Sequence, residues 1–119
     1  MKDKWKIVYY ETPQGNSPVF NFISNLELKA RTKVANTLDL LKEFGIQLSL
    51  PHSKKITGTD LWELRILGSE SIRIFYVAII GKNFLLLHGF QKKKQKTDRK
   101  EIKTAEERLR DYRSRIKYS

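Results

Sequence analysis

The chain has 119 residues, of which 39% are hydrophobic, 31% are charged and none is cysteine, and its formal net charge is +11. These values predict one soluble globular domain over residues 1–119 and exclude disulfides, thiol nucleophiles and cysteine metal sites. With only two histidines, no metal and no other cofactor is expected. No apolar run approaches the ~20 residues of a membrane span, and the first residues lack a secretory signal, so we expect a cytoplasmic protein without a membrane partner.

The positive charge is unevenly distributed along the chain. Residues 1–50 carry seven Lys or Arg and five Asp or Glu, a balance of +2, whereas residues 51–119 carry seventeen and eight, a balance of +9. A one-sided basic surface is typical of a protein that binds a polyanion. The charge therefore predicts nucleic acid or the ribosome as a partner, with an acidic protein as a compatible alternative.

The first half of the chain predicts elements that build the core. Residues 5–10 form a predicted strand, and Ser17 followed by Pro18 has the pattern of a helix N-cap and first helical position. A longer helix is expected over residues 27–44, where apolar residues recur at intervals of three and four. Gly45 is the residue at which this helix should stop.

Residues 45–60 form the least regular segment, because Pro51 and Gly58 interrupt it. Lys54 and Lys55 bring positive charge just before the next apolar run. This pair is a candidate for holding RNA phosphates, although a lysine pair in a loop is more often simply solvated.

Three apolar runs follow, at residues 61–67, 71–80 and 84–91, with short connections between them. Their Ile, Val, Phe and Tyr content predicts strands, and the short connections favour an antiparallel meander. On the second strand, alternation predicts one face with Ile72, Ile74, Tyr76, Ala78 and Ile80 and another with Arg73, Phe75, Val77 and Ile79.

Two of these strands contain an isolated arginine. Arg65 lies in the first strand and Arg73 in the second. A buried unpaired arginine is costly, so each either forms an ion pair with Glu63 or Glu70, or lines an open and wet surface. The sequence leaves these two interpretations open.

The third strand carries a histidine and runs into a series of lysines. Alternation predicts that His88 shares a face with Phe84, Leu86 and Phe90, where it is either a packed histidine or a proton-transfer group. The lysines are a solvated strand end or, within the basic half of the chain, a binding site for an RNA backbone: Lys92, Lys93, Lys94 and Lys96.

The last helix is expected to begin at Asp98 or Lys100, and Asp98 with Glu101 has the spacing of a capping box. Its apolar stripe consists of Ile102, Ala105, Leu109, Tyr112 and Ile116. The predicted fold is therefore α+β, in the order strand–helix–helix–three-stranded antiparallel meander–helix. We expect a single small sheet with the helices packed on one face.

These residue types suit one reaction, the metal-free cleavage of RNA by its own 2′-hydroxyl. Guanidinium groups fit the equatorial oxygens of the phosphorane, and lysine or histidine moves protons when nearby charges shift its pKa towards neutrality. No Gly-rich phosphate loop, HExxH motif or recognisable Ser-His-Asp arrangement is present.

An ordered set of motifs covers nearly the whole chain. The first motif is G-x-x-L-x-x-P, from Gly45 to Pro51. It is followed in order by L-W-E-L-R-I, I-R-I-F-Y, L-H-G-F-Q-K-K and K-T. The set ends with the closing helix, which contains Ala105, Leu109 and Tyr112. The set resembles the HigB-like, phage-derived branch of the RelE/ParE toxin superfamily. The resemblance implies a RelE-like fold and the toxin of a type II toxin–antitoxin pair, which cleaves mRNA on the ribosome without a metal ion. It further implies a helix-turn-helix, HigA-like antitoxin as partner, through which alone operator DNA would be reached.

The resemblance also implies roles for single residues. Arg73 matches the family's phosphate-stabilising arginine, Arg65 the arginine of the ELR motif, and Lys92 and Lys93 a basic residue that stabilises the transition state. Where some relatives have catalytic lysines, this chain has Leu61 and Glu63, so Glu63, His88, Lys54 and Lys55 all remain candidates for the general base. The predicted contacts to RNA or the ribosome are Lys54, Lys55, Lys92, Lys94 and Lys96. The alternatives are a ParE-like toxin acting on DNA gyrase and a basic RNA- or protein-binding module without catalysis.

Overall fold

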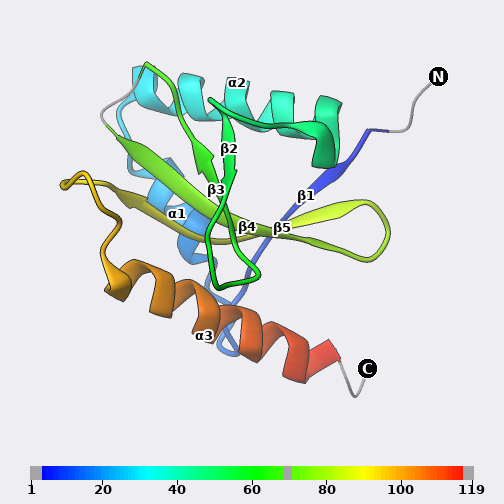
Figure 1. The fold of residues 1–119 in the computed structure, drawn as a ribbon. Helices are drawn as coiled ribbons and strands as arrows, with labels where there is room; N and C mark the ends of the chain where they lie inside the picture. The colour runs from blue at the N-terminus through cyan, green and yellow to red at the C-terminus, as the bar shows by residue number, and fades with distance from the viewer. Residues whose placement is uncertain (1–3, 69–70, 117–119) are drawn as a thin grey trace.

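The computed structural model describes residues 4–68 and 71–116. Within these residues, one five-stranded sheet is flanked by three α-helices (Figure 1). The elements are β1 (Lys6–Tyr9), α1 (Pro18–Ser24), α2 (Leu28–Phe44), the 3-10 helix η1 (Gly45–Gln47), β2 (Ser53–Lys55), β3 (Trp62–Arg65), β4 (Ile72–Ile79), β5 (Asn83–Gln91) and α3 (Arg99–Ile116). None of the described helices is both long enough and apolar enough to cross a membrane.

The strand order in the sheet is β1-β5-β4-β3-β2. The predicted antiparallel meander is confirmed, because β3 pairs with β4 and β4 pairs with β5, both antiparallel. Two further strands extend it. β1 runs parallel to β5 at one edge, and β2 forms a hairpin with β3 at the other, within the segment for which the sequence indicated only irregular structure.

The helices lie on both faces of the sheet, so the expectation of helices on one face was wrong. α1 and α2 cover one face and α3 covers the other (Figure 1). The reason lies in β4, where Ile74 and Tyr76 are buried against α2, and Phe75 and Val77 are buried against α3. A strand that is apolar on both sides needs a layer on each side. The predicted alternation of the two faces of β4 is confirmed.

The long helix α2 has nearly the predicted bounds, and it ends where a glycine is required. Gly45 adopts a positive φ of 59°, a conformation that L side chains rarely adopt. A Cβ atom at this position would also lie 2.5 Å from Trp5 Nε1. Pro18 begins α1 as predicted, but Ser17 makes no side-chain cap hydrogen bond.

A β-bulge in β5 changes which residues share a face. Phe75 pairs with His88 whereas the next residue, Tyr76, pairs with Leu86, so Leu87 is the extra residue. The bulge turns His88 and Phe90 towards α3, and the expectation that His88 shares a face with Phe84 and Leu86 was therefore wrong. Gly89 then faces α1, where a Cβ atom would lie 2.6 Å from the Phe22 ring.

Both apolar and polar contacts attach α3 to the rest of the molecule. Of its predicted stripe, Ala105 and Leu109 are buried, and Ile116 is 48% exposed. The Tyr10 hydroxyl donates to Asp111 Oδ2 over 2.6 Å. Asp98 Oδ1 accepts from the Lys100 N–H, as a cap should, but the predicted capping box is incomplete because the Glu101 carboxylate binds His88 instead.

Candidate functional site

Three charged residues of β3 and β4 form the centre of the candidate site. Arg65 and Arg73 stand directly opposite each other in the strand register, and Glu63 stands opposite Phe75. Residues that stand opposite each other project from the same face, and Phe75 is buried under α3. All three charged side chains therefore lie on the α3 face of the sheet.

Glu63 joins the two arginines. Its Oε1 lies 3.2 Å from Arg65 Nε and 3.8 Å from Arg73 Nε, and the Glu63 side chain is only 2% exposed. Its other oxygen, Oε2, accepts a hydrogen bond of 3.3 Å from the Thr97 hydroxyl. The ion-pair interpretation of the arginines therefore holds with Glu63, whereas Glu70, the other predicted partner, lies outside the described residues.

The arginines retain donors that the protein does not use. Arg65 pairs through Nε, and Arg73 donates from Nη1 to the Ile72 carbonyl over 3.1 Å. Both Nη atoms of Arg65 and Nη2 of Arg73 have no hydrogen-bond partner among the described residues. Burial lowers the pKa of Arg73, the neighbouring Glu63 raises it and Arg65 lowers it. A guanidinium nevertheless stays charged in a protein, so the pair offers free N–H groups to an anion.

Two open hollows lie beside this charged centre. The first measures about 240 Å³ and is lined by Glu63 and Arg65 together with Lys54, Lys55, Lys92 and Lys96. The second measures about 210 Å³ and adds Lys93, Lys94 and Lys100, next to Phe90 and the carboxylates of Asp98 and Glu101. Lys92 and Lys96 line both hollows. We call the two hollows together the basic groove.

The structure brings most of the predicted site residues together in the basic groove. Lys54 stands opposite Glu63 in the β2–β3 register. The lysines that follow β5 line the same hollow as Lys54 and Glu63. Arg73 lines neither hollow; it lies behind the groove, in an ion pair with Glu63, which lines it.

His88 lines neither hollow, although two residues that it contacts, Phe90 and Glu101, line the second one. Its Nε2 is 2.8 Å from Glu101 Oε1, and Arg108 Nη1 donates to its Nδ1 over 3.2 Å, so the proton of the neutral ring is on Nε2. The ring also stacks on Phe90 with 5.4 Å between centroids. Burial lowers the pKa of His88, the hydrogen bond to Glu101 raises it, and the charge of Arg108 lowers it. Both ring nitrogens are thus engaged in attaching α3 to β5.

Three residues near the site had no role in the sequence-based prediction. Thr97 and Arg108 act across long sequence separations, and no local pattern indicates such contacts. The carbonyl of His52 accepts from the Arg65 N–H over 2.8 Å, and its Nδ1 is buried with no hydrogen-bond partner among the described residues. Recognising β2 would have placed His52 next to Arg65.

A resident metal ion has no obvious ligand set here. Within residues 4–68 and 71–116, no three His, Asp or Glu side chains gather closely enough to hold a metal ion. The arrangement offers guanidinium and ammonium groups instead, and these bind phosphate oxygens directly.

Comparison with known families identifies one match. Residues 21–110, well over half of the chain, match the family model described as "Phage derived protein Gp49-like (DUF891)". A comparison with curated proteins finds no match. The matched region contains the whole meander and every residue of the basic groove. The chain therefore belongs to the phage-derived Gp49-like family, a family of RelE/HigB-type toxins of toxin–antitoxin systems, whose members have an antitoxin as partner.

Proposed function

We propose that this chain is a HigB-like toxin that cleaves mRNA on the ribosome as a metal-free endoribonuclease and thereby inhibits translation. The observation that carries the proposal is the pair Arg65 and Arg73, which one buried carboxylate holds beside a lysine-lined groove. Family membership supports a toxin, and the chemistry of the groove supports a phosphodiester as its substrate.

The free Nη atoms fit the non-bridging oxygens of the scissile phosphate. In the proposed reaction the 2′-oxygen attacks phosphorus, the bond from phosphorus to the 5′-oxygen breaks, and the products are a 2′,3′-cyclic phosphate and a 5′-hydroxyl. Negative charge on the equatorial oxygens increases towards the transition state. Arg65 and Arg73 therefore stabilise the transition state more than the bound substrate.

Two protons move in this reaction. The ammonium of Lys92 or Lys93 is placed in the groove to protonate the departing 5′-oxygen. For the acceptor of the 2′-hydroxyl proton, Glu63 and His88 are already engaged with neighbouring side chains. Lys54 stands on the site's face, and its side chain has no hydrogen bond or ion pair among the described residues, so we favour Lys54.

The remaining lysines fit a role in docking. Lys94, Lys96 and Lys55 are exposed. The proposed antitoxin is a helix-turn-helix, HigA-like protein. Contacts of lysine to a nucleic-acid backbone weaken steeply as salt rises. Association with ribosomes should therefore fall with ionic strength.

The test is brief expression in bacteria, followed by mapping of mRNA 5′ ends. We expect growth arrest and cuts inside translated codons with the wild type, and neither with Arg73→Ala. The matched control is Arg31→Ala, which removes an exposed arginine of α2 and should behave as the wild type. A DNA-damage response without mRNA loss would instead identify a gyrase poison, and ribosome association without cleavage would identify a binding module.

A further inference from the structure

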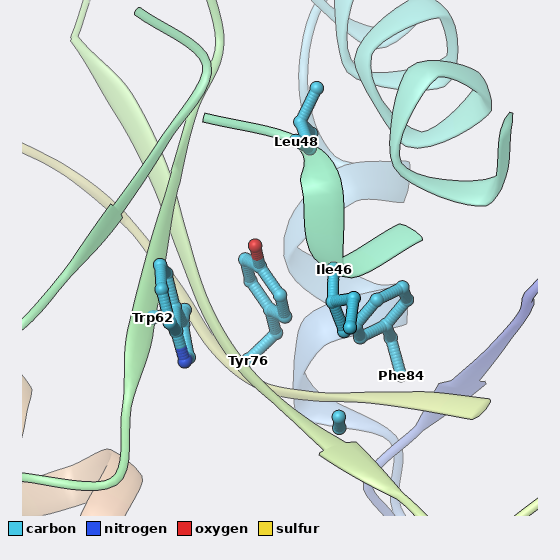
Figure 2. A pocket seen from close by; sticks show the side chains of 6 residues that line it. Ile46, Leu48, Trp62, Tyr76 and Phe84 are labelled. Carbon is cyan, nitrogen blue, oxygen red and sulfur yellow. The ribbon is translucent and has the colours of Figure 1, made fainter. Parts of the chain in front are cut away.

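The face opposite the basic groove has a small apolar hollow that remains open. It measures about 60 Å³ and is lined by Ile46, Leu48, Trp62, Tyr76, Ala78 and Phe84. Figure 2 shows Trp62 on one side, Ile46 with Phe84 on the other, and Tyr76 between them. Ile46 is 72% exposed and Trp62 is 36% exposed. The volume suits the branched end of an aliphatic side chain.

The floor of this hollow is rigid. The ring of Phe84 stacks on Trp5 with 4.2 Å between centroids and meets Tyr76 edge-on at 5.3 Å. The Tyr76 hydroxyl is further hydrogen-bonded to Ser53. A side chain that enters the hollow therefore meets a preformed surface, which lowers the entropic cost of binding.

An open strand edge borders the hollow. β3 pairs with β4 only from Arg73 to Tyr76, so residues 77–79 of β4 have no strand on that side within the described part of the chain. The β2–β3 hairpin turns away towards α3, while the β4–β5 hairpin projects past it (Figure 1). Ile80, at the end of this edge, is 95% exposed. An unpaired strand edge beside an apolar hollow is a site for strand addition.

The charges around this edge are mainly positive. Lys82 follows the exposed Ile80 in the hairpin turn, and Lys55, whose ammonium donates to the Thr59 carbonyl and also lines the groove, stands opposite Trp62 in the strand register. The carboxylate of Glu43, which precedes η1, is already paired with Lys4 at 3.5 Å. An incoming segment that carries carboxylates complements these lysines, whereas a second copy of this chain, with a net charge of +11, is repelled.

We propose that the antitoxin adds an extended acidic segment to the edge of β4 at residues 77–80 and inserts one aliphatic side chain into the hollow beside Ile46 and Trp62. This inference rests on the toxin–antitoxin assignment but not on the nuclease chemistry. The added segment extends the sheet at the edge of β4 and places its inserted side chain on the α2 face, so it leaves the basic groove, on the α3 face, uncovered. The antitoxin then holds the toxin without occupying its phosphate site.

The experiment uses the complex of the full chain with its cognate antitoxin, purified after co-expression. Hydrogen exchange should show new protection at the amides of residues 77–80 in the complex and none at residues 92–97. Ile46→Glu should weaken the affinity at least about tenfold, as substitution of a central anchor does. Leu28→Glu, at an aliphatic residue that is 69% exposed on α2, should leave the affinity unchanged.

Several outcomes would overturn the inference. Protection confined to the basic groove would show that the antitoxin covers the site itself, and an affinity loss equal in both variants would show a non-specific effect of charge. A dimer of the free chain that Ile46→Glu dissociates would assign the edge to a second copy. Binding and cleavage are measured separately, so a chain that binds the antitoxin at β4 without cutting mRNA would refute the proposed nuclease and leave this inference standing.

Discussion

Two clusters of cations and carboxylates lie on the α3 face of the sheet, and they differ in how far their side chains line the groove. In the first, Glu63 joins Arg65 and Arg73. In the second, Glu101 and Arg108 engage the two nitrogens of His88. Glu63 and Arg65 of the first cluster line the hollow of about 240 Å³. In the second cluster Glu101 lines the neighbouring hollow of about 210 Å³, whereas His88 and Arg108 line neither and link β5 to α3.

The comparison shows that access to the groove separates an arginine that can bind an anion from one that links two elements. Arg65 keeps both Nη atoms without a partner among the described residues and borders the groove. Arg108, by contrast, donates from Nη1 to both the Leu87 carbonyl and His88. Similar residue types therefore fit an anion in one place and fix a helix in the other.

The largest expected effect separates the two clusters by activity. Arg73→Lys keeps the positive charge but removes the planar fork, so the cleavage rate should fall at least about 10²-fold. Arg108→Lys should leave the rate per folded molecule unchanged. Both rates are measured by primer extension on ribosome-bound mRNA, and equal losses in the two variants would erase the distinction.

The second effect concerns the free energy of unfolding. Glu63→Ala leaves two guanidiniums facing each other without their shared carboxylate, and partial exposure of Arg65 moderates the cost. We expect a loss of about 2–3 kcal/mol, at or below the range for broken buried pairs. Urea denaturation measures it, with Glu63→Gln as the variant that keeps the shape. An unchanged midpoint in Glu63→Ala would contradict the joining role of this carboxylate.

The third effect concerns Glu101, which binds His88 in the second cluster and also lines the groove. Glu101→Ala removes the hydrogen-bond partner of His88 Nε2, and the expected loss of stability is about 1 kcal/mol. Cleavage per folded molecule should not change. A large loss of activity with little loss of stability would place the second cluster in the active site.

The fourth effect tests the link between the lysine segment and the arginines. Thr97→Val removes the hydroxyl that donates to Glu63, so the lysines of residues 92–96 should be held less firmly. The expected cost is about 0.5–1 kcal/mol, seen as a several-fold loss of cleavage that Thr97→Ser restores. Thr32→Val is the matched control, because the Thr32 hydroxyl donates to a carbonyl within α2. An equal loss of cleavage in this control would contradict a specific role for the Thr97–Glu63 hydrogen bond.

The smallest effect is a pH dependence of stability. Burial is the main cause that lowers the pKa of His88, so as pH falls below about 6.5 the unfolded chain takes up the proton first. The contribution of His88 to the free energy of unfolding is complete above that pH, and it declines as pH falls towards the lowered pKa of His88 in the folded state. Unfolding free energies at pH 7.5 and 5.5 should differ less in His88→Gln than in the wild type; the same difference in both would contradict this sign.

Local patterns predicted much of the fold. The meander, both faces of β4, the extent of α2 and most of the α3 stripe follow from periodicity and turn residues. The cluster of candidate residues followed as well, because Glu63, Arg65 and Arg73 lie on neighbouring strands of a meander. The two-sided burial of β4 could have been inferred from its nearly continuous apolar sequence, which is the signal for helices on both faces.

The remaining features depend on contacts between distant parts of the chain. The sequence by itself determined the positive charge, the alternating faces of β4 and the presence of two arginines beside one glutamate, since these depend on residue order alone. Only the tertiary structure decided that a bulge turns His88 towards α3, that Thr97 reaches Glu63 and that residues 77–79 of β4 have no strand beside them on the β3 side within the described part of the chain. A one-residue shift in strand pairing reverses every face beyond it, and no local pattern records where that shift occurs.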